Sequence, residues 1–317
     1  MIEYYRTQEN DEIRQIEGYQ VGCWVHVVAP SPDEIDYLSK KLDIPKDHIL
    51  DPLDKEERSR IELKHVEENF KHSLVIVDCP IEAKDEMGFL EFKTIPIGII
   101  TTKEVVVTVV LKQLPVLEDI MDRRMEQYNT ANHVQFLLQI LYAVSYYFLK
   151  YLNSLIEHMH TLEKDIRQSM QNEELYAFMA AQRSLVFFAT ALQSNKAVLD
   201  KMIQAGHYTD KDEDEELLQD VIIENKQAIA MTDTYTQIVG GMSDTFSSVI
   251  ANNLNRVMKF LTSFTIILSL PTIVASIYGM NVKLPFSNQE YAFGLIMVGT
   301  LIITIITTVI FWRKKYF

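Results

Sequence analysis

Two long apolar stretches near the C-terminal end form the strongest pattern in the chain. No charged residue occurs from Phe260 to Val282, and none occurs from Tyr291 to Trp312. A helix needs about 20 apolar residues to cross the hydrocarbon core of a bilayer, so each stretch is long enough to span it. The connection from Tyr278 to Glu290 is short, which predicts a two-helix transmembrane hairpin. These lengths disfavour the alternative, two core helices of a water-soluble protein.

Mostly small polar residues follow one face of the first span. They recur at steps of three or four, which places them along one side of a helix: Asn255, Met258, Thr262, Thr265, Ser269, Thr272 and Ser276. Such a stripe is either a packing face between membrane helices or the wetted lining of a pore. One hairpin cannot enclose a channel, so the pore interpretation requires several copies of the chain. The stripe alone leaves both interpretations open.

The N-terminal part alternates between strand-like and helix-like runs. Segments rich in β-branched residues predict strands at Cys23–Val28, Ser73–Val77, Ile95–Thr101 and Val105–Val110. A helix is expected after Ser31 or Pro32, because acids follow there and favour the positive end of the helix dipole. From His133 the apolar residues recur every three or four positions, which predicts two long helices packed as an antiparallel hairpin. No proline occurs from Glu215 to Leu270, so one helix is predicted from about Glu215 to Ile277.

The predicted fold is an α+β cytoplasmic domain with long helices and a continuous stalk helix that enters a two-helix transmembrane hairpin, mainly helical overall. The expected parts are a cytoplasmic α/β domain (1–130), a helical hairpin (131–207), an acidic loop and stalk helix (208–257), the first transmembrane helix with its mouth (258–281), an outer loop (282–290), the second transmembrane helix (291–312) and a basic cytoplasmic tail (313–317).

Charge is divided unequally between these parts. The chain has a net charge of −14, yet residues 258–317 hold five basic residues and one acid, which leaves −18 for residues 1–257. An acidic protein lacks the basic face that nucleic-acid phosphates require, so nucleic acid is not expected as a partner. Basic residues flank the outer ends of the hairpin, which predicts a multi-pass protein of the cell (inner) membrane with both termini in the cytoplasm.

Enzyme signatures are missing from the sequence. There is no Gly-rich phosphate loop, no GxSxG, no HExxH and no EF-hand spacing. Cys23 and Cys79 are the two cysteines, so neither a disulfide framework nor a CxxC metal or redox site is expected. Neither span contains an acid or a base, so a proton relay would have no carriers there. The sequence therefore favours a protein that is not an enzyme.

A short motif stands at the outer end of the first span: Tyr278, Gly279, Met280 and Asn281. Together with two C-terminal spans, an acidic cytoplasmic part and a basic tail, this Gly-Met-Asn sequence resembles the CorA family of divalent-cation (magnesium) channels and transporters. The resemblance implies a homopentamer whose selectivity mouth is formed by Tyr278 and the Gly-Met-Asn residues. It is closest from about Asp220 to Phe317 and loose over the first 130 residues.

The resemblance also implies which residues line the pore. Counted back from the motif, they are Asn255, Met258, Leu261, Thr265, Ser269 and Thr272. Ser269 replaces a more usual apolar residue, and Pro271 lies one place from the usual proline. The acidic outer loop of the family is replaced by a segment with one lysine, Lys283, and one acid, Glu290, so weaker attraction of cations to the mouth is expected.

Regulatory Mg²⁺ is a further expectation from the resemblance. Family members bind it between cytoplasmic subunits, and the matching acids here are Asp220 on the stalk helix and Asp51 on the neighbouring subunit. Leu50 stands where the family often has a second acid, so the number of ions at this site, one or two, is left open. The expected mechanism is that loss of internal Mg²⁺ removes the bridge and lets the acidic subunits repel one another.

The expected cargo is hydrated Mg²⁺, with Co²⁺ or Ni²⁺ as further candidates, moving down its electrochemical gradient. The expected partners are other copies of the chain, divalent cations and the lipid bilayer. One alternative keeps the fold and transports Zn²⁺ or another transition metal; the absence of Cys and His after residue 207 argues against soft ligands in the pore. The other alternative is a non-conducting, membrane-anchored helical scaffold.

Overall fold

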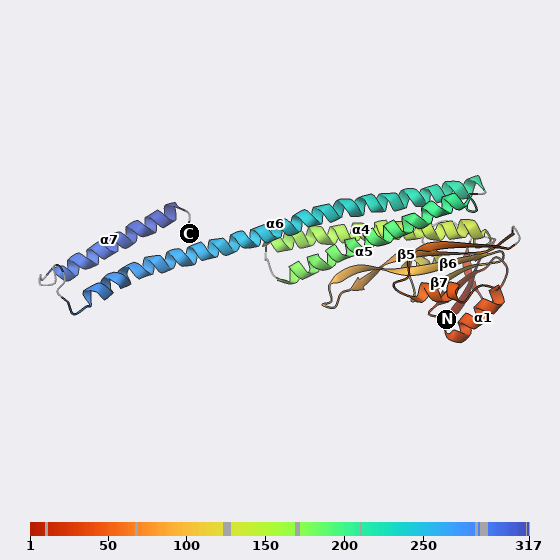
Figure 1. The fold of residues 1–317 in the computed structure, drawn as a ribbon, viewed down its shortest axis with the longest axis horizontal. Helices are drawn as coiled ribbons and strands as arrows, with labels where there is room; N and C mark the ends of the chain where they lie inside the picture. The colour runs from red at the N-terminus through yellow and green to blue at the C-terminus, as the bar shows by residue number, and fades with distance from the viewer. Residues whose placement is uncertain are drawn as a thin grey trace. The chain divides into compact units, whose positions relative to one another are not determined.

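The computed structural model describes residues 1–9, 12–66, 69–122, 128–168, 172–209, 211–282, 285, 291–314 and 316. The chain divides into two compact units, Met1–Val239 and Gly240–Phe317. The first unit contains a mixed sheet and long helices, and the second contains two apolar helical segments (Figure 1).

A seven-stranded sheet forms the centre of the first unit. Its order is β2-β1-β3-β7-β6-β5-β4, with β1 (Ile2–Thr7), β2 (Ile13–Ile16), β3 (Trp24–Val28), β4 (Arg60–Val66), β5 (Asn69–Lys84), β6 (Leu90–Thr102) and β7 (Val106–Val110). The β3–β7 pair is parallel, and the other pairs are antiparallel. The four strand predictions are confirmed as β3, β5, β6 and β7.

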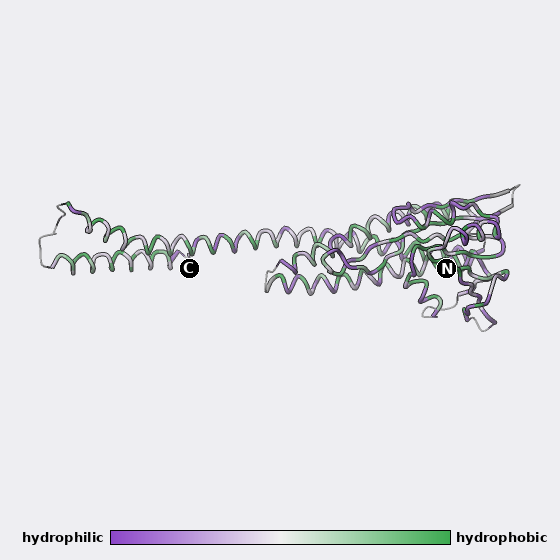
Figure 2. Tube along the Cα trace, turned by 90° about the horizontal axis from the view of Figure 1, so that it is seen from below, coloured by the Kyte–Doolittle hydropathy of each residue, from purple (hydrophilic) through white to green (hydrophobic). Residues whose placement is uncertain are grey.

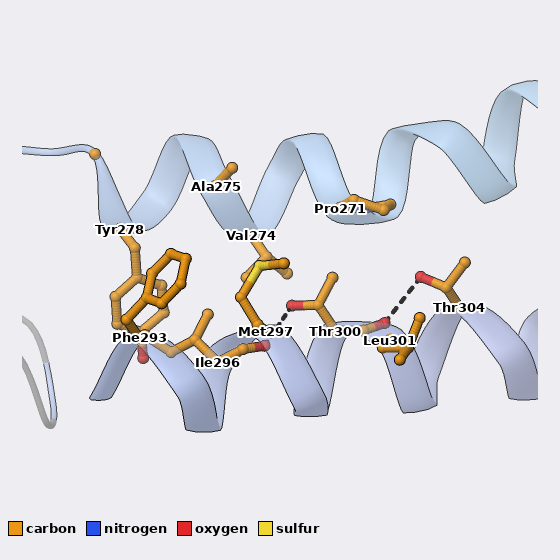
Figure 3. A pocket seen from close by; sticks show the side chains of 11 residues that line it. Pro271, Val274, Ala275, Tyr278, Phe293, Ile296, Met297, Thr300, Leu301 and Thr304 are labelled. Atoms are coloured by element: carbon orange, nitrogen blue, oxygen red, sulfur yellow. Dashed lines mark hydrogen bonds between the residues drawn. The ribbon is translucent and has the colours of Figure 1, made fainter. Parts of the chain in front are cut away.

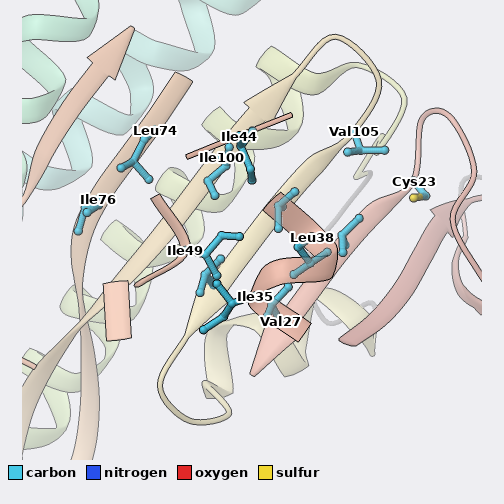
Figure 4. Packing of buried hydrophobic residues seen from close by; sticks show 13 residues of the cluster. Cys23, Val27, Ile35, Leu38, Ile44, Ile49, Leu74, Ile76, Ile100 and Val105 are labelled. Atoms are coloured by element: carbon cyan, nitrogen blue, oxygen red, sulfur yellow. The ribbon is translucent and has the colours of Figure 1, made fainter. Parts of the chain in front are cut away.

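Short helices cover one face of the sheet. They are α1 (Pro32–Leu42), α2 (Asp47–Leu50) and the 3₁₀ turn η1 (Asp51–Leu53), and α3 (Pro115–Met121) follows β7. The helix predicted after Ser31 or Pro32 is α1, and Ser31 caps it: the Ser31 hydroxyl accepts from the Glu34 N–H, and the Glu34 carboxylate accepts from the Ser31 N–H. Ile35 and Leu38 of α1 pack with Ile100 of β6 in a buried cluster beneath these helices (Figure 4).

Two long helices, α4 (His133–Gln168) and α5 (Asn172–Ala205), cover the sheet around β5 and β6. Phe188 of α5 meets Phe148 of α4, with ring centroids 5.3 Å apart. Asn195 fixes α5 to β5, because its side chain accepts from the Asp78 N–H at 2.8 Å and donates to the Asp78 carbonyl at 2.8 Å. The predicted helical pair is confirmed, and the sheet lies between helices on both faces.

One helix, α6, runs from Asp212 to Tyr278 without interruption, and α7 runs from Ala292 to Arg313. The predicted continuous helix is confirmed. Among the described residues, three helices are long and apolar enough to cross a membrane: α5, α6 and α7. The apolar window of α5 is half buried within the first unit, whereas those of α6 and α7 are almost wholly exposed. Figure 2 shows this hydrophobic character along α7 and the C-terminal part of α6.

Candidate functional site

The polar stripe, together with Leu261 of the predicted pore lining, lies on an exposed face of α6. Asn255, Met258, Leu261, Thr265 and Thr272 are exposed, and Ser269 is half-buried. The opposite edge of the helix is less exposed at Ser263, Ile267, Leu270 and Val274. Three of these, Ser263, Ile267 and Val274, each follow a residue of the exposed face by two positions, a rotation of about 200°. Within the second unit, the stripe therefore points away from the covered edge of its own helix.

Three hydroxyls of the stripe bond to the backbone of their own helix. Thr265 Oγ1 donates to the Leu261 carbonyl at 2.8 Å, Ser269 Oγ to the Ile266 carbonyl at 2.9 Å and Thr272 Oγ1 to the Leu268 carbonyl at 3.0 Å. A hydroxyl that donates in this way still has acceptor lone pairs. The exposed face consequently offers neutral oxygen acceptors at three levels.

The other face of α6 meets α7 across an apolar cavity of about 540 Å³ (Figure 3). It is lined by Pro271, Val274, Ala275, Tyr278 and Gly279 from α6 and its end, and by Phe293, Ile296, Met297, Thr300, Leu301 and Thr304 from α7. The hydroxyls of Thr300 and Thr304 donate to carbonyls of α7 itself, each at 2.8 Å. This space is suited to apolar packing and offers a hydrated ion little to bind.

The Gly-Met-Asn motif forms the end of α6. The helix ends at Tyr278, and the Gly279 N–H donates to the Ala275 carbonyl at 2.9 Å. A Cβ at Gly279 would lie 3.3 Å from the Ala275 carbonyl oxygen, a tight contact that glycine avoids. Asn281 is exposed. Most of the predicted outer loop, including Lys283 and Glu290, and part of the predicted tail, including Lys315, lie outside the described residues.

Asp220 is exposed on α6 within the first unit. Burial raises the pKa of Tyr142 on α4, and the charges of Glu224 and Asp220 raise it further. The three side chains therefore lie near one another where α4 and α6 run together. Of the two acids, Asp220 is exposed and Glu224 is half-buried, so Asp220 is the one open to a cation or to another copy of the chain.

Asp51 is held by an arginine. It begins η1, and its carboxylate accepts from Arg60 Nη2; the same guanidinium binds Glu57 and Glu62. Pro52 fits against Gly98 of β6 so closely that a Cβ there would lie 2.2 Å from Pro52 Cγ. Glycine at position 98 is thus required for η1 to pack against β6, and this packing positions Asp51.

The structure does not bring the two predicted regulatory acids together in one chain. Among the described residues, no hydrogen bond or ion pair joins Asp51 to Asp220, and no group of three or more His, Cys, Asp or Glu side chains could hold a metal. Sequence reasoning missed Arg60 and Gly98. The alternation Arg60, Glu62, Lys64 along one strand face was the available signal for a charged cluster.

Comparisons with known proteins agree with this architecture. The family described as "CorA-like Mg2+ transporter protein" matches residues 19–315. The "Cobalt/magnesium transport protein CorA" of Methanocaldococcus jannaschii is 27% identical over 311 residues, covering 96% of this chain and 94% of that protein. The "Magnesium transport protein CorA" of Campylobacter jejuni subsp. jejuni is 20% identical over 307 residues, covering 92% and 90%.

A solved structure shows the same fold. The complete structure of the CorA magnesium transporter from Methanocaldococcus jannaschii superposes with a TM-score of 0.80 at 22% sequence identity, and it covers 100% of this chain and 99% of that one. The predicted combination of a mixed-sheet domain, a long stalk helix and apolar C-terminal helices is confirmed by this likeness.

Proposed function

Because this chain belongs to the CorA-like Mg²⁺ transporter family, we propose that it carries hydrated Mg²⁺ through a pore formed by α6 from several copies of the chain. The family consists of transporters and not enzymes, which confirms the expectation that the chain is not an enzyme. Its apolar helices make it a membrane protein. Five copies, a cytoplasmic location of both termini and the cell (inner) membrane are part of the proposal.

The observation that carries the pore proposal is the exposed face of α6. In one chain its stripe faces away from the covered edge of the helix, and its hydroxyl lone pairs are open. A ring of α6 helices with this face inward would surround a water-filled path, while their other faces meet lipid or α7. The same arrangement explains why polar side chains occur inside a span that lacks charge.

The chemistry of the mouth suits a strongly hydrated ion. Mg²⁺ gives up its water reluctantly and prefers octahedral oxygen ligands. A ring of Asn281 carboxamides and Gly279 carbonyls would offer neutral oxygens to the water shell of the ion. Neutral dipoles hold the ion weakly enough to release it, as conduction requires. The membrane potential supplies about 4.6 kcal/mol when two charges cross 100 mV.

The gate in this proposal lies deeper along the stripe. Met258 and Leu261 are 52% and 54% exposed in the single chain, so their side chains are free to form apolar rings between copies. Narrow apolar rings block ions when water leaves them. Closure would therefore require only that the α6 helices approach one another at these two levels.

Regulation would act through Asp51 and Asp220 of neighbouring copies. Mg²⁺ held between them would keep the acidic cytoplasmic parts together, and its loss would let them separate. Arg60 already neutralises Asp51, so Mg²⁺ must compete with this guanidinium. That competition would make the affinity of the regulatory site for Mg²⁺ weak, as suits a site that responds to an abundant ion.

Co²⁺ is the second candidate cargo. The matched protein from Methanocaldococcus jannaschii is named for both cobalt and magnesium. After residue 207 the chain has no His or Cys, so no imidazole or thiolate would trap a transition metal in the pore. Co²⁺ would pass here as a hydrated ion by the same neutral oxygens.

The test is Mg²⁺ influx into proteoliposomes under an inside-negative potential. Asn281→Ala should lower the influx at least tenfold, because each copy loses its mouth carboxamide. Asn252→Ala is the matched control, since Asn252 is also exposed on α6 but faces away from the stripe by helical position; it should keep near wild-type influx.

Equal influx in the Asn281 and Asn252 variants would remove Asn281 from the mouth. Influx of Zn²⁺ without Mg²⁺ would favour the transition-metal alternative. No flux of any divalent ion from a folded, reconstituted oligomer would favour the membrane-anchored scaffold.

A further inference from the structure

Two buried histidines lie against each other beside η1. His48 belongs to α2 and is 7% exposed, and His72 belongs to β5 and is 1% exposed. Their ring centroids are 5.1 Å apart, with the planes at 79°. This pair lies in the first unit, and the pore proposal does not use it.

Three nitrogen atoms of the pair lack hydrogen-bond partners among the described residues: His48 Nδ1, His72 Nδ1 and His72 Nε2. Buried polar atoms are nearly always bonded, so each exception requires an explanation. Neutral imidazole nitrogens with open lone pairs are common ligands of transition metals. We propose that His48 and His72 form a binding site for a first-row transition-metal ion such as Co²⁺, Ni²⁺ or Zn²⁺.

The Glu62 carboxylate lies near the other ring nitrogen of His48. Its Oε2 lies 3.6 Å from His48 Nε2, and its Oε1 accepts from Arg60 Nε at 2.7 Å. A carboxylate on this side favours the proton on Nε2, which leaves the lone pair of Nδ1 free. Metal-binding histidines characteristically present their second nitrogen to a carboxylate in this way.

The spacing of the rings matches two imidazoles on one metal. A metal lies about 2.0–2.1 Å from each histidine nitrogen, and tetrahedral ligands subtend about 109°. These values place the two ring centroids about 5 Å apart, as they are here. Water would complete the coordination of the ion.

The surroundings of the two histidines keep both rings in the neutral form that binds a metal ion. Burial lowers the pKa of His72 to about 4, with His48, Lys71 and Lys64 contributing, and burial also lowers the pKa of His48. Both rings are therefore neutral at pH 7, the form that coordinates metals. Lys71 is paired with Asp43 at 2.7 Å, while Glu62 and Asp51 offset Arg60 near His48. Mg²⁺ prefers oxygen ligands, so the site distinguishes transition metals from Mg²⁺.

The experiment is titration of the full-length protein with Co²⁺ in a large excess of Mg²⁺ at pH 7.5, followed by visible absorption. The Mg²⁺ occupies oxygen sites, so a ligand-field band reports nitrogen ligation. The expected result is about one Co²⁺ per chain, displaced by Zn²⁺. His72→Phe should abolish the band while keeping the ring volume, and His48→Gln should weaken binding at least tenfold.

Two controls separate this site from others. His160 is exposed on α4, so His160→Gln should bind Co²⁺ as the wild type does. Asn281→Ala should also keep the band, whatever its effect on flux, so failure of the pore proposal and failure of this one are distinguishable. Circular dichroism verifies the fold of each variant.

The proposal is overturned if the wild type gives no band, or if folded His72→Phe keeps it. If His72→Phe does not fold, His48→Gln decides, because an unchanged Co²⁺ affinity in that variant also overturns the site.

Discussion

The two units of this chain differ in how far their apolar side chains are buried. In the first unit, Ile100 of β6 and Val107 of β7 are completely buried between the sheet and its covering helices. In the second unit, Ile302 of α7 is 50% exposed and Phe293 is 78% exposed. The same residue types thus form a closed core in one unit and an open surface in the other. The exposed apolar surface of the second unit is of the kind that a membrane-spanning helix presents to lipid.

Polar side chains show the same difference. In the first unit they join elements that are distant in sequence: Asn195 binds the backbone of Asp78, and Ser184 Oγ accepts from the Phe92 N–H at 2.8 Å. In the second unit the hydroxyls of Thr265 and Thr304 bond to carbonyls one turn away. In the second unit these hydroxyls consequently need no hydrogen-bond partner from lipid.

The largest expected effect compares two isoleucines. Ile100→Ala removes a fully buried side chain and should destabilise the first unit by about 2–5 kcal/mol. Ile302→Ala, on the exposed face of α7, should change that stability by less than about 0.5 kcal/mol. Trp24 is buried in β3 and Trp312 is exposed on α7, so denaturant titrations in a Trp312→Phe background follow the first unit by Trp24 fluorescence. Equal effects would contradict the separation of the two units.

The next effect tests whether the first unit controls the second. Asp220→Ala should raise the internal Mg²⁺ needed for inhibition at least tenfold, which corresponds to about 1.4 kcal/mol. Asp233→Ala is the matched control, because Asp233 is also an exposed acid on α6. Mg²⁺ currents from inside-out patches give the comparison. Unchanged inhibition in the Asp220 variant would remove this residue from regulation.

The smallest effect concerns pH. The pKa of His72 is about 4 in the folded protein and 6.5 in its ordinary state, so the unfolded chain binds a proton more readily between these values. The stabilisation is present above pH 6.5 and is lost as pH falls toward 4. His72→Phe should flatten this part of the profile, measured by Trp24 fluorescence with chelator present. An equally steep profile in the variant would show that other groups cause it.

The sequence predicted what depends on local pattern. The two apolar segments, the stalk helix, the start of α1 near Ser31 and four strands follow from apolar length, proline placement, acid position and β-branched runs. Strands β1, β2 and β4 were missed because charged residues, and in β1 also tyrosines, stand where a β-branched run would be needed. The binding of Asp51 by Arg60 and the fit of Pro52 on Gly98 depend on how distant segments pack, so no local pattern predicts them.

The stripe itself was predicted from steps of three and four residues. Its orientation was not, because periodicity places residues on one face without showing what that face meets. The structure supplies this by covering Ser263 and leaving Thr265 exposed. The assignment of that face to a water path remains the central claim.

The most direct test compares two serines on α6. Ser269→Cys places a thiol on the stripe, and Ser263→Cys places one about 120° away on the covered edge. The native Cys23 and Cys79 are buried, so a charged thiol reagent should leave the wild type unchanged. In proteoliposomes conducting Mg²⁺, the reagent should block influx through Ser269→Cys and spare Ser263→Cys. Two results would contradict a pore lined by this face. In one, the reagent blocks both variants alike; in the other, it blocks neither variant and leaves the Ser269→Cys thiol unmodified.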